Sequence, residues 1–142
     1  MKKRVFLWTA MSLACALTVA PAFAETAVKL TVGDRVLTAT FEDNATARAL
    51  MSRFPLSLPM MDLYGREMCY RFPEPLPAEN AGPSGYQVGD IAYWPPRHSF
   101  VIFYRQNGEI IDGLQRVGRM TSGTEVFQQT GDTQVKFEVY SD

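Results

Sequence analysis

The sequence is poor in the residues that most often mark an enzyme or a metal site. It contains one histidine and two cysteines. It has no zinc-ligand spacing, phosphate-binding loop, dinucleotide fingerprint or nucleophile elbow. These absences exclude the zinc proteins, nucleotide-binding proteins and serine hydrolases that are recognised by such motifs. We expect no cofactor.

Long apolar runs are also scarce, and the longest lies at the N-terminus. Residues 5–20 follow the basic residues 2–4 and precede Ala22-Phe23-Ala24, which has the small-x-small form of a signal peptidase site. The run is short for a membrane-spanning helix, which needs about 20 apolar residues. We therefore predict a signal peptide at residues 1–24, a periplasmic or secreted protein and no membrane span. A weaker alternative is lipidation of Cys15.

An excess of basic residues is absent as well. Residues 25–142 hold eleven basic and fifteen acidic side chains, which gives this part a net charge of −4. Nucleic-acid binding usually needs a basic face, so we expect no nucleic-acid partner. The length of this part fits one domain with one core, and we predict a single domain over residues 25–142.

Short alternating segments dominate that domain. Val28, Leu30 and Val32 alternate with polar residues, Gly33-Asp34 predicts a two-residue hairpin, and residues 35–41 return as its second strand. Residues 99–104 are apolar on both faces, which indicates a central strand. Gln106-Asn107-Gly108-Glu109 predicts a hairpin turn directly after it. The same patterns predict further strands at residues 56–60, 68–72, 91–94, 109–114, 115–120 and 135–139.

Two short helices are expected, near residues 43–53 and 122–130. Asp43 or Asn44 can cap the first, because their side-chain oxygens accept the free amide protons of a first helical turn. The prolines and glycines of residues 73–85 predict an extended loop. About eight strands with two helices predict a mainly β protein, a small closed β-barrel, with an open sandwich as the alternative.

Seven motifs follow one another along the chain: Glu42-Asp43-Asn44-Ala45-Thr46-Ala47-Arg48-Ala49-Leu50, Pro55-Leu56-Ser57-Leu58-Pro59-Met60, Asp62-Leu63-Tyr64-Gly65, Pro75-Leu76-Pro77, Gly89-Asp90-Ile91, Phe100-Val101-Ile102-Phe103-Tyr104 and Arg116-Val117-Gly118-Arg119. In this order they resemble the small bacterial cyclophilin-like domains, over about residues 28–139. The resemblance implies an eight-stranded β-barrel with two helices. It implies little about activity, because most of these domains have no assigned function. The predicted signal peptide and the lack of a flavodoxin-like domain are departures from that family.

The resemblance carries over no catalytic residue. True cyclophilins isomerise X–Pro bonds with an arginine, an aromatic floor and a glutamine, and their Phe-Met-x-Gln-Gly-Gly stretch is not found here. A shared fold does not grant a shared function. The preferred hypothesis is a non-catalytic module that binds a peptide segment or a small ligand. The alternative is a peptidyl-prolyl cis-trans isomerase of the cell envelope.

The best candidate binding surface is an aromatic segment. Residues 93–100 would form a rim beside the barrel on which an extended segment can dock, although they would equally serve to plug one end of the barrel. Arg71 and Arg105 each follow aromatic residues, and either would provide a polar anchor; the alternative is a solvated arginine whose stem covers apolar neighbours. The predicted ligand-binding residues are Arg71, Tyr93, Trp94, His98, Phe100 and Arg105.

A lesser alternative is a soft-metal site. Thioether and thiolate ligands select Cu(I), and the domain contains five methionines and Cys69, which together with His98 would make such a site. No Met-x-x-Met repeat is present, however. Met60 and Met68 fall at alternating strand positions, and we therefore expect them in the core and predict no metal site.

Cys69 is the single cysteine of residues 25–142. Strand alternation places it opposite Met68 and Tyr70, so it lies on the outer face of the barrel if those side chains fill the interior. An exposed thiol would react in an oxidising compartment. We therefore predict a buried, unpaired thiol that a helix or a loop covers, and the helix near residues 43–53 is a candidate for this cover.

Overall fold

The computed structural model describes residues 25–79 and 81–141. The predicted signal peptide at residues 1–24 lies outside the described residues. No helix in the described part of the chain is both long enough and apolar enough to span a membrane. The strands are β1 (Thr26–Val32), β2 (Arg35–Phe41), β3 (Leu56–Leu63), β4 (Glu67–Arg71), β5 (Pro83–Ser84), β6 (Asp90–Trp94), β7 (Ser99–Phe103), β8 (Ile111–Asp112), β9 (Gln115–Ser122) and β10 (Thr133–Val139).

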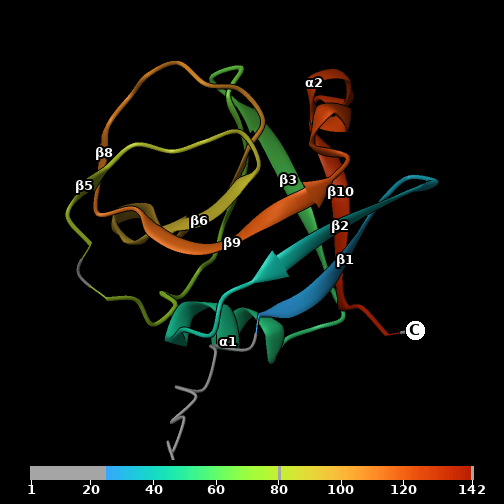
Figure 1. Ribbon diagram of the computed structural model, residues 1–142, viewed down its shortest axis with the longest axis horizontal. Coiled ribbons are helices and arrows are strands. Elements are labelled where there is room, and N and C mark those ends of the chain that lie inside the picture. The colour runs from blue at the N-terminus through green and yellow to red at the C-terminus, as the bar shows by residue number, and fades with distance from the viewer. Residues whose placement is uncertain (1–24, 80, 142) are drawn as a thin grey trace, which may run out of the picture.

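Eight of these strands form a closed antiparallel barrel in the order β1-β10-β3-β4-β7-β6-β9-β2 (Figure 1). The terminal strand β10 pairs with both β1 and β3, and β2 pairs with β9, so no edge of the sheet stays open. The predicted barrel is confirmed, and the sandwich alternative is wrong. The predicted Gly33-Asp34 hairpin also forms, with Gly33 at φ +60° between paired Val32 and Arg35.

The two helices occupy the predicted places. Helix α1 (Ala45–Met51) begins after Asn44, whose side-chain oxygen accepts a hydrogen bond from the amide of Ala47 at 2.9 Å. A 3₁₀ turn at Thr124–Val126 leads into α2 (Phe127–Thr130). The helices lie at opposite ends of the view in Figure 1 and bury Leu50 and Phe127 in the barrel core.

The barrel interior is one hydrophobic cluster. Met60 and Met68 belong to it, which confirms their expected core positions. It is closely filled by aromatic rings, including Phe100 and Phe137, whose centroids are 5.4 Å apart. The strands β1, β2, β3 and β10 alternate between buried and more exposed residues, as a barrel wall with one solvated face requires.

The wall formed by β4, β7 and β6 is largely buried on both faces. All five residues of β7 are buried, as are the first four of β6 and the first three of β4. A second, smaller hydrophobic cluster lies outside the barrel on this wall and contains Cys69, Tyr86, Ala92, Val101 and Phe103. The loops that carry β5 and β8 cover it, and these two strands pair with each other away from the barrel (Figure 1).

The predicted hairpin turn at residues 106–109 is wrong. The strand Ile111–Asp112 pairs with Pro83–Ser84 rather than with β7. Contacts from a distant loop hold the intervening residues instead: the Tyr86 hydroxyl donates to the Asn107 side chain at 2.9 Å and accepts from the Asn107 amide at 3.1 Å. Packing against Tyr86 therefore outweighs the local turn preference of Asn107-Gly108.

Candidate functional site

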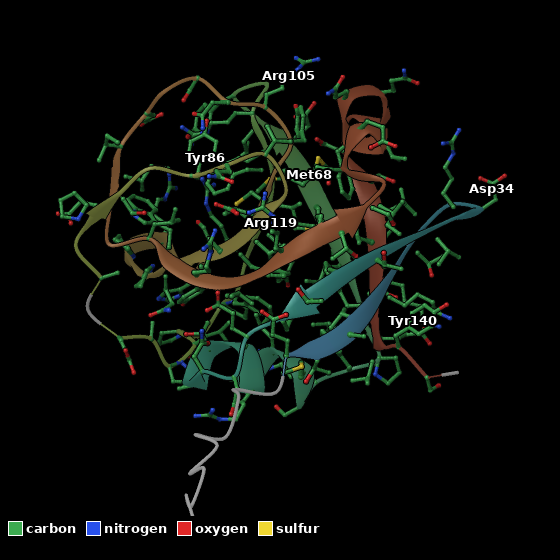
Figure 2. The ribbon with its side chains drawn as sticks, viewed as in Figure 1. Asp34, Met68, Tyr86, Arg105, Arg119 and Tyr140 are labelled. Atoms are coloured by element: carbon green, nitrogen blue, oxygen red, sulfur yellow. The ribbon has the colours of Figure 1, made fainter. Side chains whose placement is uncertain are left out.

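A pocket of about 510 Å³ opens on the outer face of the doubly buried wall. Its floor comes from alternate residues of β4 and β7, and its walls come from the loops on either side. Figure 2 labels Tyr86 on the side of the covering loops and Asp34 at the tip of the β1–β2 hairpin, on the opposite side of the molecule.

Strand register arranges the floor in three rows. Arg71 lies opposite Ser99, and Ser99 lies opposite Trp94, which makes a polar row ending in an indole ring. Cys69 lies opposite Val101 in the next row. Because residues directly opposite in an antiparallel pair have neighbouring side chains, each row is a continuous strip of surface.

The third row pairs Glu67 with Phe103 and closes one end of the pocket. The buried Arg66 donates to Glu67 from Nε at 2.9 Å and also forms ion pairs with Glu67 and Glu109 through its other nitrogens. Its guanidinium also lies 5.7 Å from the Phe103 ring centroid. The charges at this end of the pocket are therefore paired with one another, and the Arg66–Glu109 pair ties the covering loop to the barrel.

Burial changes the acid–base behaviour of this floor. It raises the pKa of the Glu67 carboxyl, and the hydrogen bond and charge of Arg66 offset only part of that rise. It also raises the pKa of the Cys69 thiol, more than the neighbouring Ser99 hydroxyl and the positive charge of Arg71 lower it. Cys69 is therefore a neutral thiol at physiological pH and not an activated nucleophile.

At the other end of the pocket, Arg71 has no ion pair, within the described part of the chain, of the kind that Arg66 forms. Its Nε atom is buried and has no hydrogen-bond partner among the described residues. Within the same part of the chain, neither Arg71 nor Arg97 has a carboxylate oxygen within 4.0 Å. A buried donor without an acceptor is costly, so the hydrogen bonding of Arg71 is incomplete among the described residues.

The model of the Cyclophilin-like family matches residues 30–138, which is most of the chain. The chain belongs to the cyclophilin-like family. A hypothetical protein of Archaeoglobus fulgidus with a known solution structure has the same fold as this family member. The TM-score is 0.66 at 14% identity, over 85% of this chain and 99% of that one. No curated protein matches the sequence.

Two of the predicted ligand-binding residues meet in the pocket of this cyclophilin-like domain. Arg71 and Trp94 both line it, one strand apart on either side of Ser99. The Trp94 indole donates to the carbonyl of Asp112 at 2.9 Å, which fixes the ring against the covering loop. The polar anchor and one aromatic residue of the predicted rim therefore belong to one surface.

The other four predicted residues lie elsewhere. Tyr93 and Phe100 point into the barrel core because they alternate with Trp94 and Ser99. Nδ1 of His98 is 3.0 Å from the carbonyl oxygen of Phe72 and does not line the pocket. Arg105 is exposed beyond the end of β7, with its guanidinium 5.5 Å from the Tyr104 ring centroid (Figure 2). The rim is thus divided between the interior and the outer surface.

Sequence reasoning missed most of the pocket lining, although one signal pointed to it. A barrel strand that is apolar on both faces must be covered on its outer side, and residues 99–104 have that pattern. The pattern does not identify the cover, which comes from loops distant in sequence. The missed lining residues are Leu63, Tyr64, Arg66, Glu67, Cys69, Arg97, Ser99, Val101, Phe103, Asn107, Glu109, Ile111 and Leu114.

Of the two covers expected for Cys69, a helix or a loop, the structure has the loop. The thiol is buried, unpaired and on the outer face, as expected. Helix α1 does not cover it, because Ala47 and Leu50 of that helix pack into the barrel core. Tyr86, Ile111 and Leu114 of the loops pack in the cluster of Cys69 instead. Met60 and Met68 lie in the barrel core, so their thioethers do not converge with this thiol on one metal site.

Proposed function

We propose that the protein is an exported binding module whose pocket beside Arg71 and Trp94 holds a peptide segment or a small ligand without catalysis. The observation that carries the proposal is the pocket itself. Ligand sites typically have volumes of about 300–1,000 Å³ and apolar walls with a few converging polar groups. The volume of about 510 Å³ and the lining by Val101, Leu114 and Arg71 fit that description.

Export is the second part of the proposal. It rests on the sequence of residues 1–24, with its basic start, apolar run and Ala22-Phe23-Ala24. A buried thiol also suits an oxidising compartment, because the loops shield Cys69 from oxidants.

Chemical-shift mapping tests the binding proposal. A panel of short peptides and of small acids, amides and amines would be added to the ¹⁵N-labelled protein. We expect at least one compound to shift the indole N–H signal of Trp94 and the amide signals of β7. Leu114→Trp should abolish these shifts by filling the pocket. Val36→Trp is the matched control, because Val36 is 58% exposed on the opposite hairpin.

Shifts that survive in Leu114→Trp, or that fall on strands away from the pocket such as β1 and β2, would refute this pocket as the binding site. Thermal unfolding of both variants shows whether the added ring has damaged the barrel. A variant that unfolds within a few degrees of the unchanged protein is suitable for the comparison.

A peptidyl-prolyl isomerase is the rival function, and one observation favours it. Arg71, whose Nε has no hydrogen-bond partner among the described residues, lines a pocket that also contains Val101 and Leu114. Isomerases need a donor that stabilises the prolyl nitrogen as amide resonance is lost. The uncatalysed barrier is about 20 kcal/mol, so even weak catalysis is measurable. A protease-coupled assay with a proline peptide decides between them: a rate increase that Arg71→Met abolishes would establish the isomerase.

A further inference from the structure

Only some of the charged side chains that line the pocket have an ion-pair partner among the described residues. Three arginines and two glutamates line it, which leaves one positive charge in excess. Arg66 forms ion pairs with both Glu67 and Glu109, so that end of the pocket keeps one net negative charge. The other end carries two positive charges, because Arg71 and Arg97 have no carboxylate partner among the described residues.

Burial makes Arg71 the stronger recognition element of the two. Arg97 is exposed, and water solvates its charge. Arg71 is partly buried, and its unpartnered Nε lacks solvent contact. An arginine fork matches the two oxygens of a planar carboxylate, and such charge-assisted pairs are stronger than neutral hydrogen bonds.

The glutamates limit the charge that the ligand can carry. Glu67 and Glu109 line the same pocket, and their negative charges disfavour a ligand that carries two negative charges. The floor next to Arg71 is apolar, since it is made by Cys69 and Val101 and faces Leu114. A single negative charge attached to an apolar body fits both ends of this surface.

We propose, on the basis of the binding function above, that the pocket recognises a monocarboxylate with an apolar body. The carboxylate pairs with Arg71 beside Ser99, and the body lies over Cys69 and Val101 against Leu114. Two sources offer this chemistry: a small carboxylic acid, or the C-terminal carboxylate of a peptide that ends in an apolar residue. The ligand completes the hydrogen bonding of Arg71.

Matched acid and amide probes test this proposal by titration calorimetry on the full chain. The small-molecule pair is 4-phenylbutyrate and 4-phenylbutanamide. The peptide pair is N-acetyl-Ala-Ala-Phe with a free carboxylate and the same peptide as its C-terminal amide. We expect the acid of at least one pair to bind about tenfold or more tightly than its amide, because the amide lacks the charge. The pair with the larger difference identifies the source of the carboxylate.

Arg71→Met is the decisive variant, and Arg35→Met is its matched control. Arg35 is exposed on the β1–β2 hairpin, so its replacement removes the same charge far from the pocket. We expect Arg71→Met to weaken acid binding about tenfold or more and to leave amide binding unchanged. Arg71→Lys keeps the charge without the fork, and its acid affinity should lie between those of the unchanged protein and Arg71→Met.

The possible outcomes separate this inference from the binding function. Equal binding of acid and amide, with both lost in Leu114→Trp, would overturn the carboxylate and leave the pocket as a binding site. Acid binding that Arg71→Met does not weaken would also overturn it. If no probe binds and no compound of the mapping panel shifts the Trp94 signal, both proposals fail. Should Arg71→Met not fold, the acid–amide comparison in the unchanged protein decides alone.

Discussion

At the scale of single residues, the reactivity of the Cys69 thiol measures how well the loops cover the outer face of the barrel. Its side chain is 1% exposed, and burial raises the pKa of its thiol. Because the thiolate is the reactive form, we expect iodoacetamide to label native Cys69 about tenfold or more slowly than the unfolded chain. Peptide-resolved mass spectrometry measures this rate separately from that of Cys15. Equal rates in the presence and absence of denaturant would show that the loops do not cover the thiol.

The raised pKa of Tyr104 predicts that the folded protein loses stability at alkaline pH. Burial, the hydrogen bond that its hydroxyl donates to Asp62 and the negative charge of Asp62 raise its pKa to about 12. The unfolded value is about 10, so folding favours the neutral phenol. The stabilisation is complete below pH 10 and is lost as the pH rises toward 12.

Tyr104→Phe removes this contribution. We expect the free energy of unfolding to fall less steeply between pH 10 and pH 12 in the variant than in the unchanged protein. At pH 7 the variant should be about 2 kcal/mol less stable, because Asp62 loses a donor. Denaturant titrations at several pH values measure both effects, and Tyr140→Phe at an exposed tyrosine is the control. Parallel pH profiles for Tyr104→Phe and the unchanged protein would contradict the assignment.

The face of a strand on which a residue lies could be predicted from the alternation of the sequence. Which loop residues cover that face could not, because they are far away in the sequence. The outer-facing orientation of Cys69 and the core positions of Met60 and Met68 follow from a period of two. The same rule, applied to residues 93–100, places Tyr93 and Phe100 inside and Trp94 outside. The covering side chains, above all Tyr86, come from loops that have no periodicity.

At the scale of elements, Gly118 sets how closely β9 approaches β2. A Cβ at this position would overlap the carbonyl oxygen of Thr40 and lie 3.0 Å from the Cα of Phe41. These are backbone atoms, so neither can move without displacing β2. We expect Gly118→Ala to destabilise the barrel by about 1–3 kcal/mol or more, measured by denaturant unfolding.

Gly82→Ala is the matched control for this prediction. Nothing lies within 4 Å of a Cβ at Gly82, and its backbone is outside the left-handed region. Its stability should change by less than about 0.5 kcal/mol. A Gly118→Ala protein as stable as Gly82→Ala would mean that β2 and β9 are less closely packed than described.

Turns with local causes were predictable, whereas the turn held by tertiary contacts was not. Gly33-Asp34 forms the expected turn, because Gly33 adopts a positive φ at no steric cost. Asn107-Gly108 has an equally strong local signal. Besides local bonds, Asn107 makes two hydrogen bonds to the hydroxyl of Tyr86, whose ring stacks on Phe103 with centroids 3.9 Å apart.

At the scale of the whole molecule, export has a direct test. The protein would be expressed with its full N-terminus in a bacterial host, and the intact mass of the product in the periplasm or medium would be measured. We expect a mature chain that begins at Glu25, because cleavage follows Ala24. Replacing Ala24 by a bulky residue, such as Ala24→Phe, should leave the precursor uncleaved. A product that retains Met1, or one that carries a diacylglyceryl group on Cys15, would contradict this proposal.

Barrel closure was predictable because strand number, hairpin signals and the two helices all agreed with the family resemblance. The pocket was not predictable, because it forms where the loops around β5 and β8 cover the wall of β4 and β7 incompletely. The sequence indicates Arg71 and Trp94 only by their chemistry, as a cation and an aromatic residue. Their meeting on one surface depends on the register of β4, β7 and β6.

The most direct test of the central claim is the crystal structure of the protein with the tightest-binding acid probe. We predict ligand density in the pocket of about 510 Å³, with a carboxylate oxygen within about 3.2 Å of the Arg71 guanidinium and the apolar body over Val101. Density on any other face, or a ligand in this pocket with its carboxylate directed away from Arg71, would contradict the account.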